Sequence, residues 1–351
     1  MFRNRDYGYL ALALSAWVLP ILAPAPAHAQ LWTWTREQMV EYTPTWAGER
    51  FTDGRPKVPD AWLERARGLS SEEILIMWPG SGPGGRGGAG GGRGEAGGGR
   101  GENAGRGNAQ QGQGGVLGAF GPRVNPYGQY TDGWQVIHPN KKMVGRVVTM
   151  AFLPARPDLD AVVNAKAKDK GINRLGNQTV IDLLQPGDVL VVDLYGKKEG
   201  GTIVGDNLFY YIMKTTKTGG LVVDGAVRDL EGIKDMDMPA YVRAVHPSAI
   251  NGATVAAVNV PIRIGEVTVM PGDVAIGDPE GVTFVPPQLL EGILDRADTT
   301  HVHDEWTKKK FDEGKYKSQD IYGSPHDPAL VKEYDEYLKK RLEEIRKSNP
   351  K

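Results

Sequence analysis

The sequence predicts an α/β fold on a mixed sheet, of the α+β kind, for the part of the chain that follows Met143. Short runs rich in Val and Ile alternate with turn residues from this point onward, which is typical of strands. Helical patterns separate the earlier strands. The later strands are joined by turns as short as Met270-Pro271-Gly272-Asp273, which favours antiparallel hairpins over repeated crossovers.

Residues 1–29 have the three-part pattern of a secretory signal peptide. A basic start precedes an apolar run over 9–23 and a small-residue site at Ala27-His28-Ala29, so cleavage is expected before Gln30. The alternative is a membrane anchor, which needs about 20 apolar residues, whereas this run is shorter and contains Pro20. We therefore expect an exported protein, periplasmic or extracellular, with no membrane contact after cleavage.

Composition excludes several classes of function. The chain has no cysteine, which rules out disulfides, a thiol nucleophile and a thiolate metal site. Its formal net charge is −1, which gives no reason to expect a nucleic-acid partner. Any function must therefore come from a local site.

Two segments precede the main domain. Residues 30–80 are expected to be an N-terminal extension packed on that domain, with short helices at 60–67 and from Ser70-Ser71-Glu72, where acidic residues follow a serine. Residues 81–115 are dominated by glycine and have no apolar groups to bury, so we expect a disordered linker or insertion. Its arginines leave nucleic-acid binding as the alternative, but Glu95 dilutes their charge and no aromatic residues alternate with them.

The main domain is expected over 116–297 and a helical tail over 298–351. In the tail, apolar residues from Val331 to Ile345 recur at helical spacing, which predicts an amphipathic helix packed on the body or on a neighbouring subunit. Strands are expected at 145–152, 188–194, 220–224, 240–245, 254–260, 266–270, 273–276 and 282–285, and helices at 180–184, 207–216 and 287–297.

The most informative stretch runs from Gly205 to Asp229. A glycine-led turn that opens a helix leaves backbone N–H groups free at Asn207 and Leu208, where a small carboxylate or phosphate can bind. Further on, Arg228-Asp229 follows a strand that we expect to close at Asp224-Gly225.

That dipeptide offers two kinds of chemistry. Arg228 supplies a fork for a carboxylate or enolate oxygen, and Asp229 supplies a hard oxygen ligand for Mg²⁺ or Mn²⁺. An Arg-Asp pair after a strand is, on its own, more often a surface ion pair.

The stretch from Gly205 to Asp229 is followed by two further motifs, Val269-Met270-Pro271-Gly272-Asp273 and Gly277-Asp278-Pro279-Glu280-Gly281-Val282. In this order of motifs the chain resembles the RraA-like family over residues 143–297. The family contains the regulator of ribonuclease E activity and the class II aldolases for 4-hydroxy-4-methyl-2-oxoglutarate, which also decarboxylate oxaloacetate. The resemblance implies a swivelling β/β/α-type core, here with an N-terminal extension and C-terminal helices.

In the aldolase branch the resemblance implies roles for five residues. Asp229 binds the divalent metal, Mg²⁺ or Mn²⁺, and Arg228 contacts the keto acid and steadies its enolate. Asp206 orders metal-bound waters, while the amides of Asn207 and Leu208 hold the pyruvyl carboxylate beside Gly205.

One spacing departs from the aldolase pattern. Twenty-one residues lie between Asp206 and Arg228, where the aldolases have twenty. We expect the additional residue in the loop at 214–219, where an insertion leaves both ends in place.

The function implied is that of a divalent-metal-dependent lyase that cleaves or decarboxylates a small 2-keto acid. The alternative is a non-catalytic RraA-like binding or regulatory protein. The Asp after Arg228 favours the enzyme, because the regulatory branch lacks that ligand. A homotrimer or a dimer of trimers is expected. Members of the family have also been labelled as demethylmenaquinone methyltransferases. The sequence does not support this activity, because it has no glycine-rich nucleotide-binding loop between a strand and a helix.

Other polar residues were weighed and set aside. His301 and His303 are two residues apart, so on a helix they point to different faces and make a poor metal pair. Tyr210-Tyr211 is expected to pack in the core, with one ring lining the pocket as the alternative. Glu231 and Asp235, just beyond Asp229, are either acids that support the site from behind or ordinary solvated carboxylates.

Overall fold

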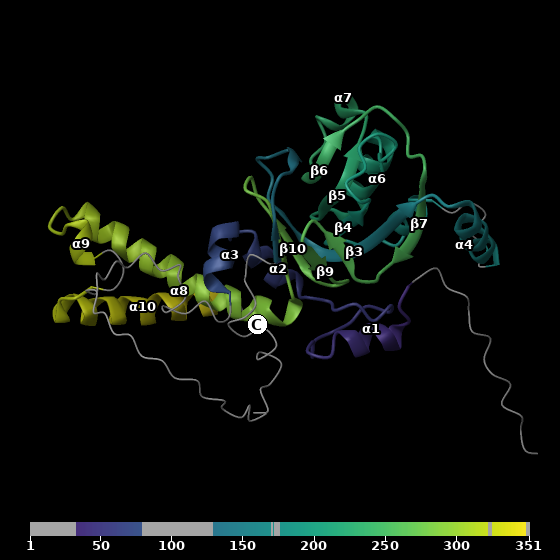
Figure 1. Cartoon of the computed structure of the whole chain (residues 1–351). Coiled ribbons are helices and arrows are strands. Elements are labelled where there is room, and N and C mark those ends of the chain that lie inside the picture. The colour runs from purple at the N-terminus through teal and green to yellow at the C-terminus, as the bar shows by residue number, and fades with distance from the viewer. Residues whose placement is uncertain (1–32, 79–128, 170, 172–175, 322–324, 349–351) are drawn as a thin grey trace, which may run out of the picture. The chain divides into compact units, whose positions relative to one another are not determined.

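The computed structural model of the protein describes residues 33–78, 129–169, 171, 176–321 and 325–348. The predicted signal peptide at 1–29 and the glycine-rich segment at 81–115 lie outside these residues. The described chain falls within one compact unit, Leu31–Lys351, whose elements are labelled in Figure 1. None of the described helices is long and apolar enough to cross a lipid bilayer.

The central feature is a curled mixed sheet. Its strands are β1 (Tyr130–Thr131), β2 (Gln135–Ile137), β3 (Met143–Pro154), β4 (Asp188–Asp193), β5 (Gly220–Val227), β6 (Ala240–Val245), β7 (Ala253–Val258), β10 (Val274–Gly277) and β11 (Val282–Val285). They lie in the order β1-β11-β10-β3-β4-β5-β6-β2, and β7 also pairs with β3. The pairings β3–β4, β4–β5 and β5–β6 are parallel, and the others are antiparallel. This confirms the predicted α/β class with a mixed sheet.

The late strands form the antiparallel hairpins that their short turns predict. β10 pairs with β11, and β8 (Ile262–Ile264) pairs with β9 (Val267–Val269) in a separate two-stranded sheet. β8 was not predicted, nor were β1 and β2, because each is only two or three residues long and too short to show a period.

The described helices are α1 (Arg36–Tyr42), α2 (Asp60–Ala66), α3 (Ser71–Met77), α4 (Pro157–Asp169), α5 (Gln178–Ile181), α6 (Asp206–Thr216), α7 (Leu230–Ile233), α8 (Pro287–Asp312), α9 (Ser318–Ile321) and α10 (Pro328–Ser348). The predicted start of α3 is confirmed, since the side chain of Ser70 accepts the Glu73 N–H and that of Glu73 accepts the Ser70 N–H. α1, α4, α7 and α9 were not predicted. α4 carries little amphipathic pattern.

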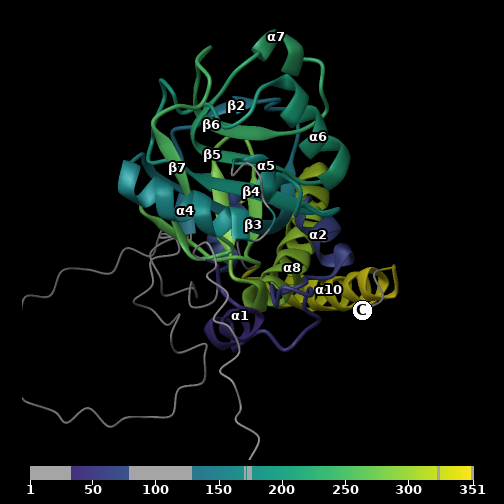
Figure 2. The same ribbon diagram turned by 90° about the vertical axis from the view of Figure 1, so that its right-hand side faces the viewer.

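The sheet is buried on both faces. Alternate residues of β4 and β5, such as Leu190 and Val223, pack under α5 and α6 together with Phe209. Figure 2 shows these two helices beside β4 and β5. The intervening residues, such as Val191 and Val222, pack against the β8–β9 hairpin. Burial on both faces explains why these strands are continuous runs of Val and Leu.

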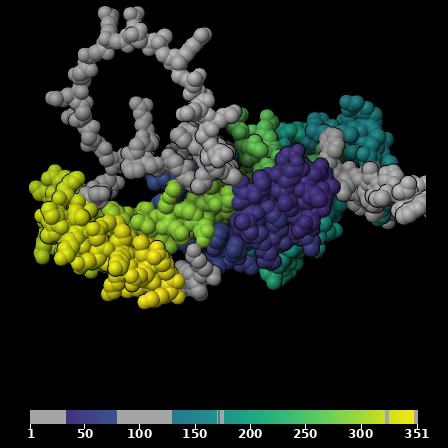
Figure 3. All heavy atoms as spheres, turned by 90° about the horizontal axis from the view of Figure 1, so that it is seen from below, coloured from purple at the N-terminus to yellow at the C-terminus, as the bar shows by residue number. Residues whose placement is uncertain are grey.

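The N-terminal extension packs on the main domain, as predicted. Trp46, Leu63 and Trp78 form a cluster with Leu289 and Ile293 of α8, and Figure 3 shows this segment, in purple, beside α8 in green. The extension thus completes the core on this side of the sheet.

Arg55 joins the N-terminal extension to the sheet through buried polar contacts. Its guanidinium is buried and contacts Asp188 Oδ1, at the start of β4, at 3.2 Å and Asp53 at 2.9 Å. It also donates to the carbonyl of Val147 in β3 at 3.3 Å. One side chain therefore links the extension to two central strands.

The end predicted at 297 for the helix that begins at Pro287 is wrong, because α8 continues without a break to Asp312. Its second half carries α10, as Trp306 packs with Leu330 and Tyr334, and Figures 1 and 2 show the two helices side by side. The predicted amphipathic tail helix is α10, and it packs on α8 of the same chain.

Replacing Arg55 with Ala should lower the free energy of unfolding by about 3–5 kcal/mol, because the Asp188 carboxylate would stay buried without its partner. Denaturant unfolding of the full chain measures this. Lys57→Ala is the matched control, since its pair with Glu49 is exposed, and it should change stability by less than about 1 kcal/mol. Equal losses for both variants would contradict the role given to Arg55.

Stability should also depend on the buried Asp273, whose pKa is raised by burial to about 7. Between about pH 4 and 7 the folded state keeps this proton and the unfolded state loses it, so stability should fall as pH rises, by at most about 1.4 kcal/mol per pH unit. Asp273→Asn should flatten this slope in unfolding experiments at several pH values. An unchanged slope would show that Asp273 does not cause it.

Candidate functional site

The candidate site forms where the segment 201–204 pairs with the end of β5. The Ala226 N–H donates to the Gly201 carbonyl at 2.9 Å, and the Ile203 N–H returns a bond to Ala226 at 3.0 Å. Two residues on, the Arg228 N–H donates to the Val204 carbonyl at 3.1 Å. This register brings the beginning of α6 beside the end of β5.

β5 does not close at Asp224-Gly225 as expected, because it runs on to Val227 through an irregularity in its pairing with β6 between Val223 and Ala226. Asp224 sits within this irregularity and pairs with Arg243 of β6 at 2.7 Å. A bulge of this kind bends a strand and re-aims the residues that follow. Arg228 and Asp229 are those residues.

Arg228, Asp229 and Gly205 lie in mutual contact. Arg228 Nε is 3.4 Å from Asp229 Oδ2, and both side chains are about two-fifths exposed, at 42% and 41%. A Cβ atom on Gly205 would overlap Asp229 Oδ2 and lie 3.1 Å from Arg228 Nε. A side chain at position 205 would therefore have to displace the carboxylate of Asp229 or the guanidinium of Arg228.

Asp229 has a left-handed backbone, with φ of 59° and ψ of 42°, and it is the N-cap of α7. A non-glycine residue in this region is uncommon, although Asp is tolerated there better than most. Such conformations persist where the surroundings impose them, often at functional sites. The left-handed backbone of Asp229 is consistent with a carboxylate whose orientation is fixed by its surroundings.

Asp206 lies close to α7. A Cβ atom on Gly232 of α7 would lie 2.9 Å from Asp206 Oδ2, and the Gly232 N–H donates to the carbonyl of Asp229. Asp206 thus contacts the short helix that Asp229 caps, and the carboxylate of Asp229 lies beside Gly205, the residue before Asp206. The extra residue between Asp206 and Arg228 has not separated them.

The backbone amides of α6 differ from the prediction in one respect. The Asn207 N–H is not free, because it donates to Asp206 Oδ1 at 2.7 Å. No partner within the described residues is recorded for the Leu208 N–H. Leu208 also lines the cavity, whereas Asn207 does not.

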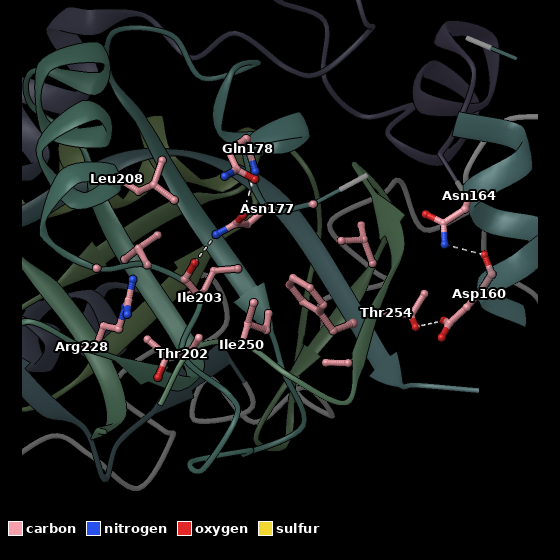
Figure 4. A pocket seen from close by; sticks show the side chains of 17 residues that line it. Asp160, Asn164, Asn177, Gln178, Thr202, Ile203, Leu208, Arg228, Ile250 and Thr254 are labelled. Atoms are coloured by element: carbon pink, nitrogen blue, oxygen red, sulfur yellow. Dashed lines mark hydrogen bonds between the residues drawn. The ribbon is translucent and has the colours of Figure 1, made fainter. Parts of the chain in front are cut away.

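A cavity of about 430 Å³ opens beside these residues. Gly205, Leu208 and Arg228 lie at one end of it, and Figure 4 shows Arg228 and Leu208 on one side of the opening. Asp206 and Asp229 are not among the lining residues. The cavity volume is typical of sites that bind whole small molecules.

Several lining residues were missed by the sequence analysis. Asn177 caps α5 and donates through Nδ2 to the carbonyl of Ile203, and Thr202 donates to the carbonyl of His246 at 3.2 Å. Asp160 and Thr254 meet across the far wall. They come from α4, which was not predicted, and from β7, so no local pattern links them.

The carboxylates of Asp229 and Asp206 are better suited to a divalent cation that keeps several water ligands than to one enclosed by protein ligands. No group of three or more His, Cys, Asp or Glu side chains able to hold a metal occurs among the described residues. Asp229 is an exposed hard-oxygen ligand with Asp206 nearby. Mg²⁺ is commonly held in this way, by one or two carboxylates with water and substrate completing its shell.

His301, which was not expected to bind a metal, and nearby Glu305 link α8 to other helices. His301 Nε2 lies 2.7 Å from Glu73 Oε1 of α3. Glu305 accepts from Tyr337 Oη at 2.5 Å and from Arg341 at 3.1 Å, both on α10. Tyr210 and Tyr211 are exposed on α6, so the core position predicted for them is wrong.

Comparison with known proteins places this chain in a family. The family "RraA-like: Aldolase/RraA" matches residues 118–284. A protein of Azotobacter vinelandii named "Putative 4-hydroxy-4-methyl-2-oxoglutarate aldolase" is 34% identical over 113 residues, which cover 32% of this chain and 67% of that protein. The chain therefore belongs to the RraA-like family.

Two further similarities bear on length and fold. A protein of the same name from Halalkalibacterium halodurans is 37% identical over 120 residues, 34% of this chain and 56% of that protein. The chain thus spans about half the length of the first curated relatives that it matches. An uncharacterized protein from Pseudomonas syringae has a TM-score of 0.50 at 18% identity, over 74% of this chain and 92% of that one, which shows a shared fold.

Gly205→Ala should weaken the binding of oxalate, a mimic of the pyruvate enolate, by about tenfold or more, because a hydrogen bond to a charged side chain that is moved out of place is worth about 1.5–3 kcal/mol. The new methyl group must displace Asp229 or Arg228. Calorimetric titration in the presence of Mg²⁺ measures the loss. Gly292→Ala on α8 is the control, since open space surrounds that position; equal affinity in both variants would contradict the geometry.

Proposed function

We propose that the protein is a divalent-metal-dependent lyase that breaks a C–C bond next to the pyruvyl unit of a small 2-keto acid. The contact of Gly205, Arg228 and Asp229 at one end of a ligand-sized cavity is the observation that carries this proposal. The names of the relatives support the reaction class.

Arg228 would bind and orient the substrate. Its guanidinium lines the cavity and can donate two parallel hydrogen bonds to a carboxylate or to an enolate and its neighbouring oxygen. Because its charge is fixed at any physiological pH, it favours the more negative enolate over the neutral ketone. The N–H of Leu208 at the start of α6 can add a donor to the same carboxylate.

Asp229 would hold the cation, with Asp206 bonded to its water ligands. Bound there, the cation supplies Lewis-acid stabilisation of the negative charge on the keto-acid oxygens. The left-handed backbone at Asp229 and the close fit of Gly205 fix the carboxylate before substrate arrives, which lowers the reorganisation needed during reaction.

We also propose export and assembly as a homotrimer or a dimer of trimers. Three apolar side chains beside the site, Tyr210 and Tyr211 on α6 and Leu230 on α7, are exposed in the single chain. A subunit contact over these rings would cover apolar surface next to the cavity. Export rests on the pattern of residues 1–29 alone.

The proposal predicts that the protein exchanges the C3 protons of pyruvate with D₂O when Mg²⁺ or Mn²⁺ is present, and that EDTA stops the exchange. Asp229→Asn should slow exchange by about a hundredfold or more, since charge stabilisation by a cation is worth several kcal/mol. Proton NMR of the methyl signal gives the rate.

Asp235→Asn provides the control, because Asp235 is an exposed acid on the same loop and should leave the rate unchanged. If Asp229→Asn keeps full metal-dependent exchange, the site has been assigned to the wrong residue. If the wild-type protein shows no exchange, the lyase proposal fails.

A further inference from the structure

We propose that the substrate of this site is a 2-keto acid whose far end is neutral and hydroxylated, and that the cavity excludes a second carboxylate there. This inference rests on the proposed function, because it takes the pyruvyl end to lie at Arg228. It concerns the opposite end of the cavity, to which no role has yet been given.

The charges of the cavity wall are distributed unevenly. Among the described residues that line it, Arg228 is the one basic side chain and Asp160 is the one acidic side chain. Figure 4 shows them at opposite ends, with Thr202 and Ile250 between them. A bound molecule therefore meets a positive group at one end and a negative group at the other.

The far wall is a small network of hydrogen bonds around Asp160. Thr254 Oγ1 of β7 donates to Asp160 Oδ1, and Asn164 Nδ2 donates to the main-chain carbonyl of Asp160 at 2.8 Å. Thr254 is buried. The contact between α4 and β7 thus fixes the Asp160 carboxylate at this end.

The rest of the wall is uncharged. Asn177, Gln178 and Thr202 offer amide and hydroxyl groups, and Phe152 and Ile250 offer apolar surface. Amides and hydroxyls can both donate to and accept from a hydroxyl group. These residues suit a chain of hydroxylated carbon atoms.

The charge of Asp160 distinguishes a substrate that ends in a second carboxylate from one that ends in a neutral hydroxylated group. A dicarboxylate held by Arg228 would bring its second carboxylate toward Asp160, and like charges at close range in a partly buried site disfavour binding. A hydroxyl group at the same place can donate to the Asp160 carboxylate. The cavity wall therefore selects against dicarboxylates by repulsion and favours hydroxylated substrates by hydrogen bonding.

Size agrees with a substrate longer than pyruvate. The cavity of about 430 Å³ extends from Gly205 to Thr254, and a pyruvyl group at Arg228 would fill only one end of it. The remaining space is lined by the polar and apolar residues named above.

The reaction on such a substrate is a retro-aldol cleavage. The hydroxyl at C4 gives up its proton, the C3–C4 bond breaks, and its electron pair forms the pyruvate enolate, while C4 becomes the carbonyl carbon of a neutral hydroxyaldehyde. A proton then adds to C3 of the enolate to give pyruvate. No oxidant or reductant is needed.

The test uses the reverse reaction, with pyruvate, Mg²⁺ and either glycolaldehyde or glyoxylate as the acceptor. Glycolaldehyde carries a neutral hydroxymethyl group on its aldehyde carbon, whereas glyoxylate carries a carboxylate there. D-Glyceraldehyde extends the neutral series by one carbon atom. The readout is the ratio of kcat/KM for glycolaldehyde to kcat/KM for glyoxylate, followed by NMR of the products.

In the wild-type protein the ratio should favour glycolaldehyde, and in Asp160→Asn it should fall by about tenfold as repulsion is removed. Asn164→Lys, which adds a positive charge at the same end, should lower it further. Asp158→Asn is the matched control on α4, because Asp158 pairs with Arg156 in solvent and does not line the cavity, and it should leave the ratio unchanged.

The inference is overturned if Asp160→Asn and Asn164→Lys both give the ratio of the Asp158→Asn control. It is overturned as well if neither neutral acceptor reacts while pyruvate proton exchange proceeds, since the proposed function then stands without this substrate class. Absence of exchange itself would instead remove the proposed function on which the inference rests.

Discussion

The site depends on the pairing of residues 201–204 with the end of β5. Three main-chain hydrogen bonds in this register set the start of α6 beside the Arg228-Asp229 turn. Gly205 then fits against both side chains because it has no Cβ atom. A shift of this register by one residue would turn the segment over and separate the groups. The proposed chemistry is thus a consequence of strand pairing rather than of a preformed metal cage.

The described N-terminal extension and α8 reinforce the opposite edge of the sheet. Asp188, which the extension reaches through Arg55, begins β4, whereas Arg228 follows the last residue of β5. Ligands of parallel sheets commonly bind at the carboxyl ends of the strands. The extension and the α8–α10 pair therefore stabilise the scaffold, and the carboxyl edge remains available for the cavity.

The sequence predicted most of the sheet, and the structure brings Gly205, Arg228 and Asp229 of the predicted motif together. Both features could be recognised from short stretches of sequence. Runs of Val and Leu mark strands buried on both faces, and a glycine turn followed later by Arg-Asp marks the motif. The left-handed backbone of Asp229 and the bulge at Asp224 were not predictable, since both arise from pairing with β6 and with residues 201–204. Asp160 and Thr254 were missed for the same reason: they are ninety-four residues apart. The bond between the Asn207 amide and Asp206 replaced an amide expected to be free.

We propose that a divalent cation and a keto acid bind together beside one end of this cavity. A crystal structure of the protein with Mn²⁺ and pyruvate, with anomalous diffraction to locate the metal, is the decisive test. We expect an anomalous peak beside the carboxylate of Asp229, with the pyruvate carboxylate on the guanidinium of Arg228. A metal bound elsewhere, or pyruvate bound away from Arg228, would contradict it.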